Sequence, residues 1–162
     1  MSYGRQRRRA GGALAFVAGL LLLLAHAPDA AAADMQAGWR AYTAGDYETA
    51  IKEWQPLAED GDYQAAYALG MAFQIKGESA SAVPWYEQAA SAGLAEAQIL
   101  LGTIYARGDA VPRDLVRAYA WLYKAAQQDS PNAPLILESV AGLMTAEEIE
   151  AAKALAATFQ SP

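Results

Sequence analysis

Two of the residue types that carry most protein chemistry are almost missing from this chain. Its 162 residues include no cysteine and one histidine, His26. Without cysteine the chain forms no disulfide, and without a Cys or His ligand set it forms no structural zinc site. We therefore expect no metal, no cofactor and no catalytic residue, and we interpret the protein as a non-enzyme whose stability comes from packing.

Positive charge is also scarce. The chain has 12 Lys and Arg against 18 Asp and Glu, which gives a formal net charge of −6. Affinity for nucleic acid comes mostly from basic side chains that neutralise phosphates, so an acidic surface argues against DNA or RNA as a partner.

The N-terminal segment is typical of an export signal. Four arginines between residues 5 and 9 precede an apolar run at 13–25, and Ala31-Ala32-Ala33 supplies the small residues that signal peptidase requires. The run is shorter than the roughly 20 residues that span a bilayer. We expect residues 1–33 to be cleaved, which predicts a periplasmic or secreted protein with no membrane span, a retained N-terminal anchor being the alternative.

Cleavage would leave residues 34–162, a length that suits a single domain. The removed segment contains four arginines and one acidic residue, Asp29, so the remaining chain is more acidic than the whole. His26 would be lost with the segment.

From Asp34 onward the pattern is helical, with apolar residues three and four apart. The spacing predicts an all-α chain with helices at 35–43, 47–59, 63–75, 82–92, 95–107, 113–128, 132–142 and 145–160.

The last of these helices has a clear start and one apolar face. Thr145 and Glu148 form the pattern of a capping box. Its apolar residues, Ile149, Ala152, Ala156 and Phe159, recur at spacings of three and four, so we expect this helix to act as a lid.

The helices repeat as pairs. Gly38, Gly70 and Gly102 are evenly spaced along the chain. Trp85 and Trp121, at equivalent positions of the second helices, are farther apart than the glycines because the connection between the two helices of the third unit is longer. A period of about 32 to 36 residues with two helices per unit indicates a helical solenoid. We expect units at about 35–61, 62–93 and 94–129, followed by C-terminal helices at about 132–160.

The three glycines predict close helix packing. Glycine inside a helix costs about 1 kcal/mol relative to alanine, so its recurrence indicates a neighbour that leaves no room for a Cβ. We expect the second helix of each pair to be that neighbour, with the Ala-Ala pairs at 89–90 and 125–126 as the matching shallow surface.

The third unit resembles the Sel-one-like repeat, a relative of the tetratricopeptide repeat. The residues that match its pattern are Ala97, Leu101, Gly102, Tyr105, Gly108, Val111, Asp114, Ala118, Trp121, Ala125 and Ala126. The second unit matches less completely, and the first looks like a tetratricopeptide-like opening unit. The resemblance implies a right-handed α-solenoid, a concave face lined by the first helix of each pair, and a role as a scaffold or adaptor in envelope or signalling complexes.

Candidate binding residues follow from the position of each glycine. Residues one and four beyond it and three before it point away from the partner helix. We expect this face to bind a peptide or protein, and the candidates are Trp39, Tyr42, Tyr67, Met71, Gln74, Ile99, Thr103 and, beside Ala106, Arg107. The alternative is that several of them pack against the neighbouring repeat.

Other functions stay open at this point. Aromatic residues in a groove suit a glycan as well as a peptide, so a glycan- or peptidoglycan-associated envelope protein is one alternative. A hydrolase that uses two carboxylates is another, with Asp46, Glu48, Glu53, Asp109 and Asp114 as the available groups. We interpret Asp46 and Asp114 as helix caps instead. We expect a monomer or weak self-association, with the N-terminal end as the favoured edge for a partner or second copy.

Overall fold

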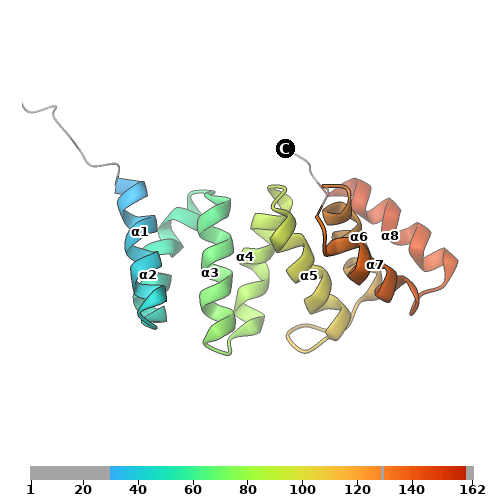
Figure 1. Cartoon of the computed structure of the whole chain (residues 1–162), viewed down its shortest axis with the longest axis horizontal. Coiled ribbons are helices and arrows are strands. Elements are labelled where there is room, and N and C mark those ends of the chain that lie inside the picture. The colour runs from blue at the N-terminus through green and yellow to red at the C-terminus, as the bar shows by residue number, and fades with distance from the viewer. Residues whose placement is uncertain (1–29, 129, 160–162) are drawn as a thin grey trace, which may run out of the picture.

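The structure, a computed structural model, describes residues 30–128 and 130–159. The helices in this part of the chain are α1 (Ala30–Thr43), α2 (Tyr47–Glu59), α3 (Tyr63–Ile75), α4 (Ser79–Ser91), α5 (Ala95–Arg107), α6 (Leu115–Ala126), α7 (Ala133–Ala141) and α8 (Ala146–Thr158) (Figure 1). The all-α prediction is confirmed. Helix α4 begins earlier than expected, at Ser79, and α6 begins later than expected, at Leu115.

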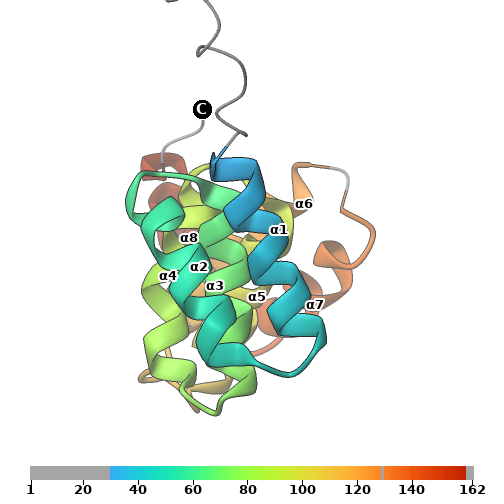
Figure 2. The ribbon, with the colours of Figure 1, turned by 90° about the vertical axis from the view of Figure 1, so that its left-hand side faces the viewer.

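The helices form a solenoid of stacked pairs. Helix α1 packs on α2, α3 on α4 and α5 on α6, and each pair contacts the next through α2 with α3 and α4 with α5. Seen from the N-terminal end, α1 and α7 lie on one side of the molecule and α4 and α8 on the other (Figure 2). The first helices of the three pairs, α1, α3 and α5, each present a glycine to the second helix of their own pair, so they occupy equivalent positions in the array.

A short turn that contains a glycine separates each of the first two units from the next. Gly61 and Gly93, at equivalent positions of consecutive units, have φ values of 99° and 97°, which glycine adopts without the strain that a Cβ would cause. After the first of these turns, the carboxylate of Asp62 accepts hydrogen bonds from the amides of Gln64 and Ala65 at 2.8 and 3.0 Å. This aspartate caps α3 in the expected way.

The helical glycines make the predicted close approach to the second helix of their own pair. A Cβ on Gly70 would lie 2.6 Å from the Tyr86 ring, and one on Gly102 would lie 2.5 Å from Cγ of Leu122. At Gly38 the nearest atoms are those of the Trp54 indole. The expectation that Ala-Ala pairs form the matching surface was wrong. The glycine instead makes a pocket for a large side chain.

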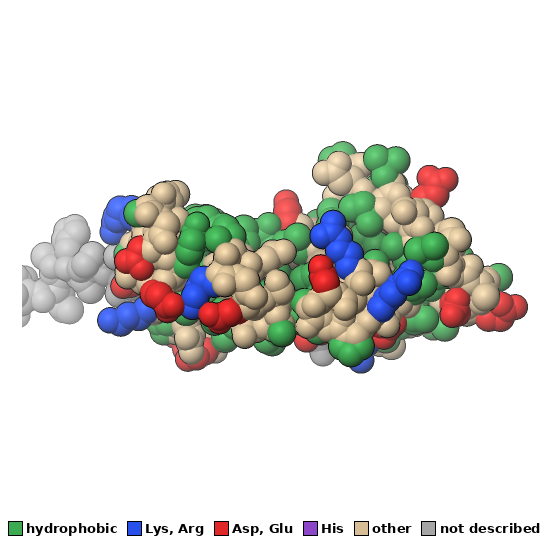
Figure 3. Space-filling view, turned by 90° about the horizontal axis from the view of Figure 1, so that it is seen from below, with side chains coloured by type: hydrophobic (Ala, Val, Ile, Leu, Met, Phe, Trp, Pro, Cys, Tyr) green, Lys and Arg blue, Asp and Glu red, His purple; other side chains and the backbone are tan. Residues whose placement is uncertain are grey.

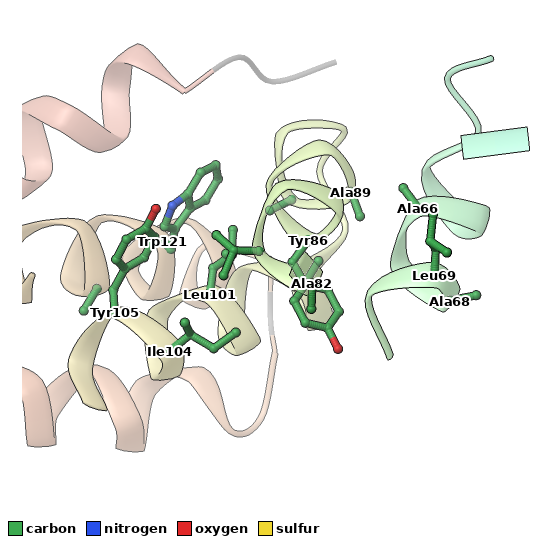
Figure 4. Packing of buried hydrophobic residues seen from close by; sticks show 14 of the residues in the cluster. Ala66, Ala68, Leu69, Ala82, Tyr86, Ala89, Leu101, Ile104, Tyr105 and Trp121 are labelled. Atoms are coloured by element: carbon green, nitrogen blue, oxygen red, sulfur yellow. The ribbon is translucent and has the colours of Figure 1, made fainter. Parts of the chain in front are cut away.

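The core runs without interruption through all the pairs. Leu69, Tyr86 and Leu101 are fully buried and come from α3, α4 and α5. Figure 4 shows such residues projecting from neighbouring helices into the space between them. Burying apolar surface between consecutive helices is what holds a repeat array together.

Buried polar groups also join one unit to the next. Gln98 is fully buried; its amide nitrogen donates to the carbonyl oxygen of Ala90 at 3.0 Å, and its oxygen accepts from Gln128 at 2.9 Å. Tyr105 donates its hydroxyl to Glu87 at 2.7 Å and accepts from Arg117 at 3.2 Å. These bonds fix the stagger of α4, α5 and α6, because a buried polar group is stabilised only where its partner is aligned.

The C-terminal end is covered as predicted. Thr145 and Glu148 form a capping box, with the Glu148 amide donating to the Thr145 hydroxyl and the Glu148 side chain accepting from the Thr145 amide. Helix α8 then packs on α6, where Phe159 stacks on Trp121 with 3.9 Å between the ring centroids. Helix α7 packs on α6 as well, so α7 and α8 do not form a fourth regular pair.

The N-terminal end has a polar outer face. Ala68 and Ala72 of α3 are buried, and the residues at the equivalent repeat positions of α1 are Gln36 and Arg40, both exposed. Polar residues at these positions are typical of a repeat that caps the end of an array. The N-terminal end as the favoured edge for a partner or second copy stays a prediction.

Candidate functional site

The face shared by α1, α3 and α5 has an open inner surface. In α3, for example, Gly70 points at α4 and Leu69 is buried, while Tyr67 and Met71 are half-buried and Gln74 is exposed. The face is hollowed: Figure 3 shows hydrophobic side chains gathered along the upper edge of the molecule, in a dip between the N-terminal helices and the projecting C-terminal part. We call this surface the inner groove.

An aromatic cluster occupies the α1 end of the inner groove. Trp39 packs edge-on against Trp54 and Tyr42, with centroid separations of 4.9 and 5.7 Å. Tyr42 also contacts Tyr47 at 5.4 Å. Trp54 is fully buried and donates its indole N–H to the carbonyl oxygen of Met35 at 3.2 Å, whereas Trp39 keeps 39% of its surface exposed. The buried tryptophan thus supports an exposed one.

Helix α3 supplies the next part of the groove. The ring of Tyr67 lies 6.0 Å from that of Tyr86, and the Tyr86 hydroxyl donates to the side-chain oxygen of Gln74 at 2.7 Å. Met71 lies between Tyr67 and Gln74 on the same face and packs partly against the core. These contacts hold the side chains in place before any partner arrives.

Helix α5 contributes less. Ile99 is half-buried against the core, and Thr103 donates its hydroxyl to the carbonyl oxygen of Ile99 at 2.9 Å. Arg107 is exposed in the last turn of α5. The predicted site residues on α1 and α3 are mostly aromatic or otherwise large, and those on α5, Ile99, Thr103 and Arg107, include no aromatic side chain.

The pKa values of the groove tyrosines are all raised. Burial is the main cause for Tyr42, Tyr67 and Tyr86, and the pKa of each is raised further by a neighbouring tyrosine. Glu96, in the first turn of α5, adds to the rise in the pKa of Tyr67. The tyrosines therefore remain neutral hydrogen-bonding groups at physiological pH, and they lie close enough to influence one another across α1, α3 and α4.

Two exposed apolar residues of α3 were missed by the rule used on the sequence. Tyr63 keeps 40% and Ile75 keeps 52% of its surface exposed. Ile75 is equivalent to Arg107 of α5, so the same helical periodicity would have found it. Tyr63, in contrast, lies two turns before Gly70 on the face of α3 that points at α4, and the periodicity does not place it in the groove.

Three of the five candidate carboxylates, Asp46, Asp114 and Glu48, make structural contacts. Asp46 accepts from the amide of Thr49 at 3.1 Å, and Asp114 accepts from the amide of Arg117 at 2.9 Å, so both cap helices as predicted. Glu48 pairs with Lys76 at 2.6 Å. Within residues 30–128 and 130–159, no three His, Asp or Glu side chains are grouped as metal ligands would be.

The same residues contain no helix that is both long enough and apolar enough to cross a bilayer. The predicted signal segment up to residue 29 lies outside the described part of the chain.

Comparison with known proteins bears directly on the repeat. The model of the Sel1 repeat matches residues 64–94 and 95–130. The chain carries two Sel1 repeats. They correspond to the second and third predicted units. None of the curated proteins compared with the chain matches it.

Two solved structures share the architecture of these Sel1 repeats. One is a protective antigen present in uropathogenic Escherichia coli strains, with 28% identity and a TM-score of 0.70 over 80% of this chain. The other is a Sel1 repeat protein from Oxalobacter formigenes, with 28% identity and a TM-score of 0.60 over 78% of this chain. The match spans 29% of the first protein's chain and 58% of the second's. Both likenesses confirm the solenoid fold.

Proposed function

We propose that this Sel1 repeat protein is a scaffold of the bacterial cell envelope that holds a segment of a partner protein in the inner groove. Sel1 repeats are generally non-catalytic modules that mediate protein binding. The observation that carries the proposal is the pre-positioned aromatic surface of α1 and α3. Exposed aromatic and methionine side chains that are already fixed by packing are typical binding anchors, because little side-chain entropy is lost when a partner arrives.

Loss of the groove side chains is expected to abolish partner capture. In the variant Tyr42→Ala/Tyr67→Ala/Gln74→Ala, the anchor surface is removed while the fully buried Trp54 and Tyr86 remain. Wild type and variant would be used as bait for the exported fraction of the source bacterium, with circular dichroism to establish that helicity is unchanged.

A matched control comes from the other layer of the solenoid. Lys52, Gln55 and Ser81 are exposed on α2 and α4, and their triple replacement by alanine leaves the inner groove intact. The proposal expects this control to capture the same partner as wild type. Equal capture by the groove variant would show that the partner binds elsewhere.

Export is a separate part of the proposal and has its own test. We expect the protein recovered from outside the cytoplasm to begin at Asp34, since signal peptidase cleaves after small residues such as those at positions 31 and 33. The likeness to a protein described as a protective antigen is in keeping with export. Mass spectrometry of the fractionated protein gives the N-terminus directly, and recovery of an intact chain from the cytoplasm alone would remove the envelope from the proposal.

A further inference from the structure

The inner groove presents a hydrogen-bond donor whose direction is fixed by a buried tyrosine. Tyr86 is fully buried, and Gln74 is the partner of its hydroxyl, at 2.7 Å. The phenolic hydrogen must be donated, because a buried hydroxyl left without an acceptor costs about 1–3 kcal/mol. The oxygen of the Gln74 amide therefore faces Tyr86, and its NH₂ group faces the groove, where it can donate to an incoming acceptor.

Two further hydroxyls on the same surface are available to a partner. Within the described residues, neither Tyr42 nor Tyr67 makes a side-chain hydrogen bond, although both rings are packed against other aromatic rings. The two tyrosine hydroxyls and the Gln74 amide are three neutral polar groups. Trp39 and Met71 add apolar surface among them. This alternation suits an extended peptide, whose unpaired main-chain carbonyls recur along the chain and whose side chains alternate in direction.

Other occupants fit this surface less well. A bound helix satisfies its main-chain groups internally, so it would offer the Gln74 donor no free main-chain acceptor. A glycan strand offers hydroxyls, but it has no aliphatic side chains to cover Met71 and the exposed Ile75.

The charge beside Tyr67 is negative. Glu96 is exposed in the first turn of α5, three residues before the groove residue Ile99 and therefore on the same face of the helix, and it adds to the rise in the pKa of Tyr67. The cation among the predicted groove residues, Arg107, lies in the last turn of α5, at the other end of that helix. The chain as a whole is acidic, with a formal charge of −6. Aromatic rings also attract cations through their faces, and in this groove Trp39 and the half-buried Tyr42 and Tyr67 supply such rings.

We propose that the inner groove binds an extended peptide segment in which a Lys or Arg lies next to apolar residues. The basic group would pair with Glu96, the apolar side chains would cover Trp39, Tyr42 and Met71, and a main-chain carbonyl would accept from Gln74. This inference rests on the proposed binding function and specifies the chemistry of the partner.

The test uses a phage-displayed library of random nonapeptides, selected on the immobilised protein. We expect the selected sequences to be enriched in Lys and Arg beside apolar residues, and selection on the variant Glu96→Gln to lose that enrichment. Glu59→Gln is the matched control, since Glu59 is exposed on α2, away from the groove, and its acceptor role toward Gln55 is retained by glutamine. The control should give the wild-type enrichment.

Affinities of one selected peptide would then test the individual contacts. Tyr67→Phe keeps the ring and removes the hydroxyl, so we expect Kd to rise about fivefold, the effect of one lost hydrogen bond. For Glu96→Gln we expect a similar rise together with a weaker dependence of Kd on salt.

The possible outcomes distinguish failure of the basic-peptide preference from failure of peptide binding itself. Selection of acidic or uncharged sequences that still depend on Tyr67 would overturn the basic partner and leave the binding function standing. Enrichment of basic peptides that is unchanged in Glu96→Gln would also overturn it. If no sequence is enriched, both the inference and the peptide-binding function are wrong.

Discussion

Replacement of Trp54 by alanine is expected to lower the free energy of unfolding by about 3–5 kcal/mol. Trp54 has no exposed surface, fills the space against Gly38 and donates its indole N–H to the carbonyl oxygen of Met35. Removal of the indole leaves a cavity between α1 and α2 and removes the hydrogen bond that joins the two helices at Met35. The loss is a large part of the roughly 5–15 kcal/mol that stabilises an ordinary domain, and urea unfolding followed by circular dichroism measures it.

Trp39→Ala is the matched control for this substitution. Trp39 belongs to the same aromatic cluster and contacts Trp54 directly, but 39% of its surface is exposed. Because less apolar surface returns to water, we expect a loss of about 1 kcal/mol. A loss of only about 1 kcal/mol for Trp54→Ala as well would mean that the α1–α2 pair contributes little to the stability of the array, and that the solenoid is held together mainly by the later units.

The second large effect is expected at Gly70. In Gly70→Ala the new methyl group would lie 2.6 Å from the Tyr86 ring, so either the ring or the helix must move. Overpacking of this kind costs about 1–3 kcal/mol, which outweighs the gain of up to about 1 kcal/mol that alanine brings to a helix interior. We expect a net decrease in the free energy of unfolding, measured in urea.

The mechanism can be tested by removing the ring. In the Tyr86→Ala background nothing opposes the new Cβ, so the same Gly70→Ala substitution should become neutral or stabilising by up to about 1 kcal/mol. The double-mutant cycle then gives a coupling energy whose sign is set by the clash. If Gly70→Ala lowers the free energy of unfolding equally in wild type and in Tyr86→Ala, the destabilisation comes from the backbone of α3 and not from the contact of α3 with α4.

Much of the fold could be predicted from the sequence because its signals are local. The spacing of apolar residues predicted the positions of the helices, and the carboxylate of Asp46 marked where α2 begins. The start of α4 was misplaced: the expected start was Ala82 and the helix begins at Ser79. Glu78, the residue before it, makes no side-chain capping bond. A boundary without a cap has no sequence signal to mark it.

The candidate site could be predicted in part for a similar reason. Helical periodicity relative to Gly70 predicted that Tyr67, Met71 and Gln74 share one face of α3, and in the structure both Tyr67 and Gln74 contact Tyr86. The bond between Gln74 and Tyr86, however, joins two helices and fixes the direction of the Gln74 amide. No spacing within one helix contains that information. The proximity of Glu96 to Tyr67 was missed for the same reason, since it depends on how α5 is staggered against α3.

The sequence by itself determined that this protein is an array of helix pairs, because the regular recurrence of its glycines and the helical spacing of its apolar residues are both properties of the chain. Tertiary structure decided what each glycine contacts. Gly38, Gly70 and Gly102 predicted a close neighbour, but only the packing of the pairs made that neighbour Trp54, Tyr86 or Leu122. The physical reason is geometric: the partner of a residue depends on the crossing and stagger of two helices, which are set by all the side chains between them.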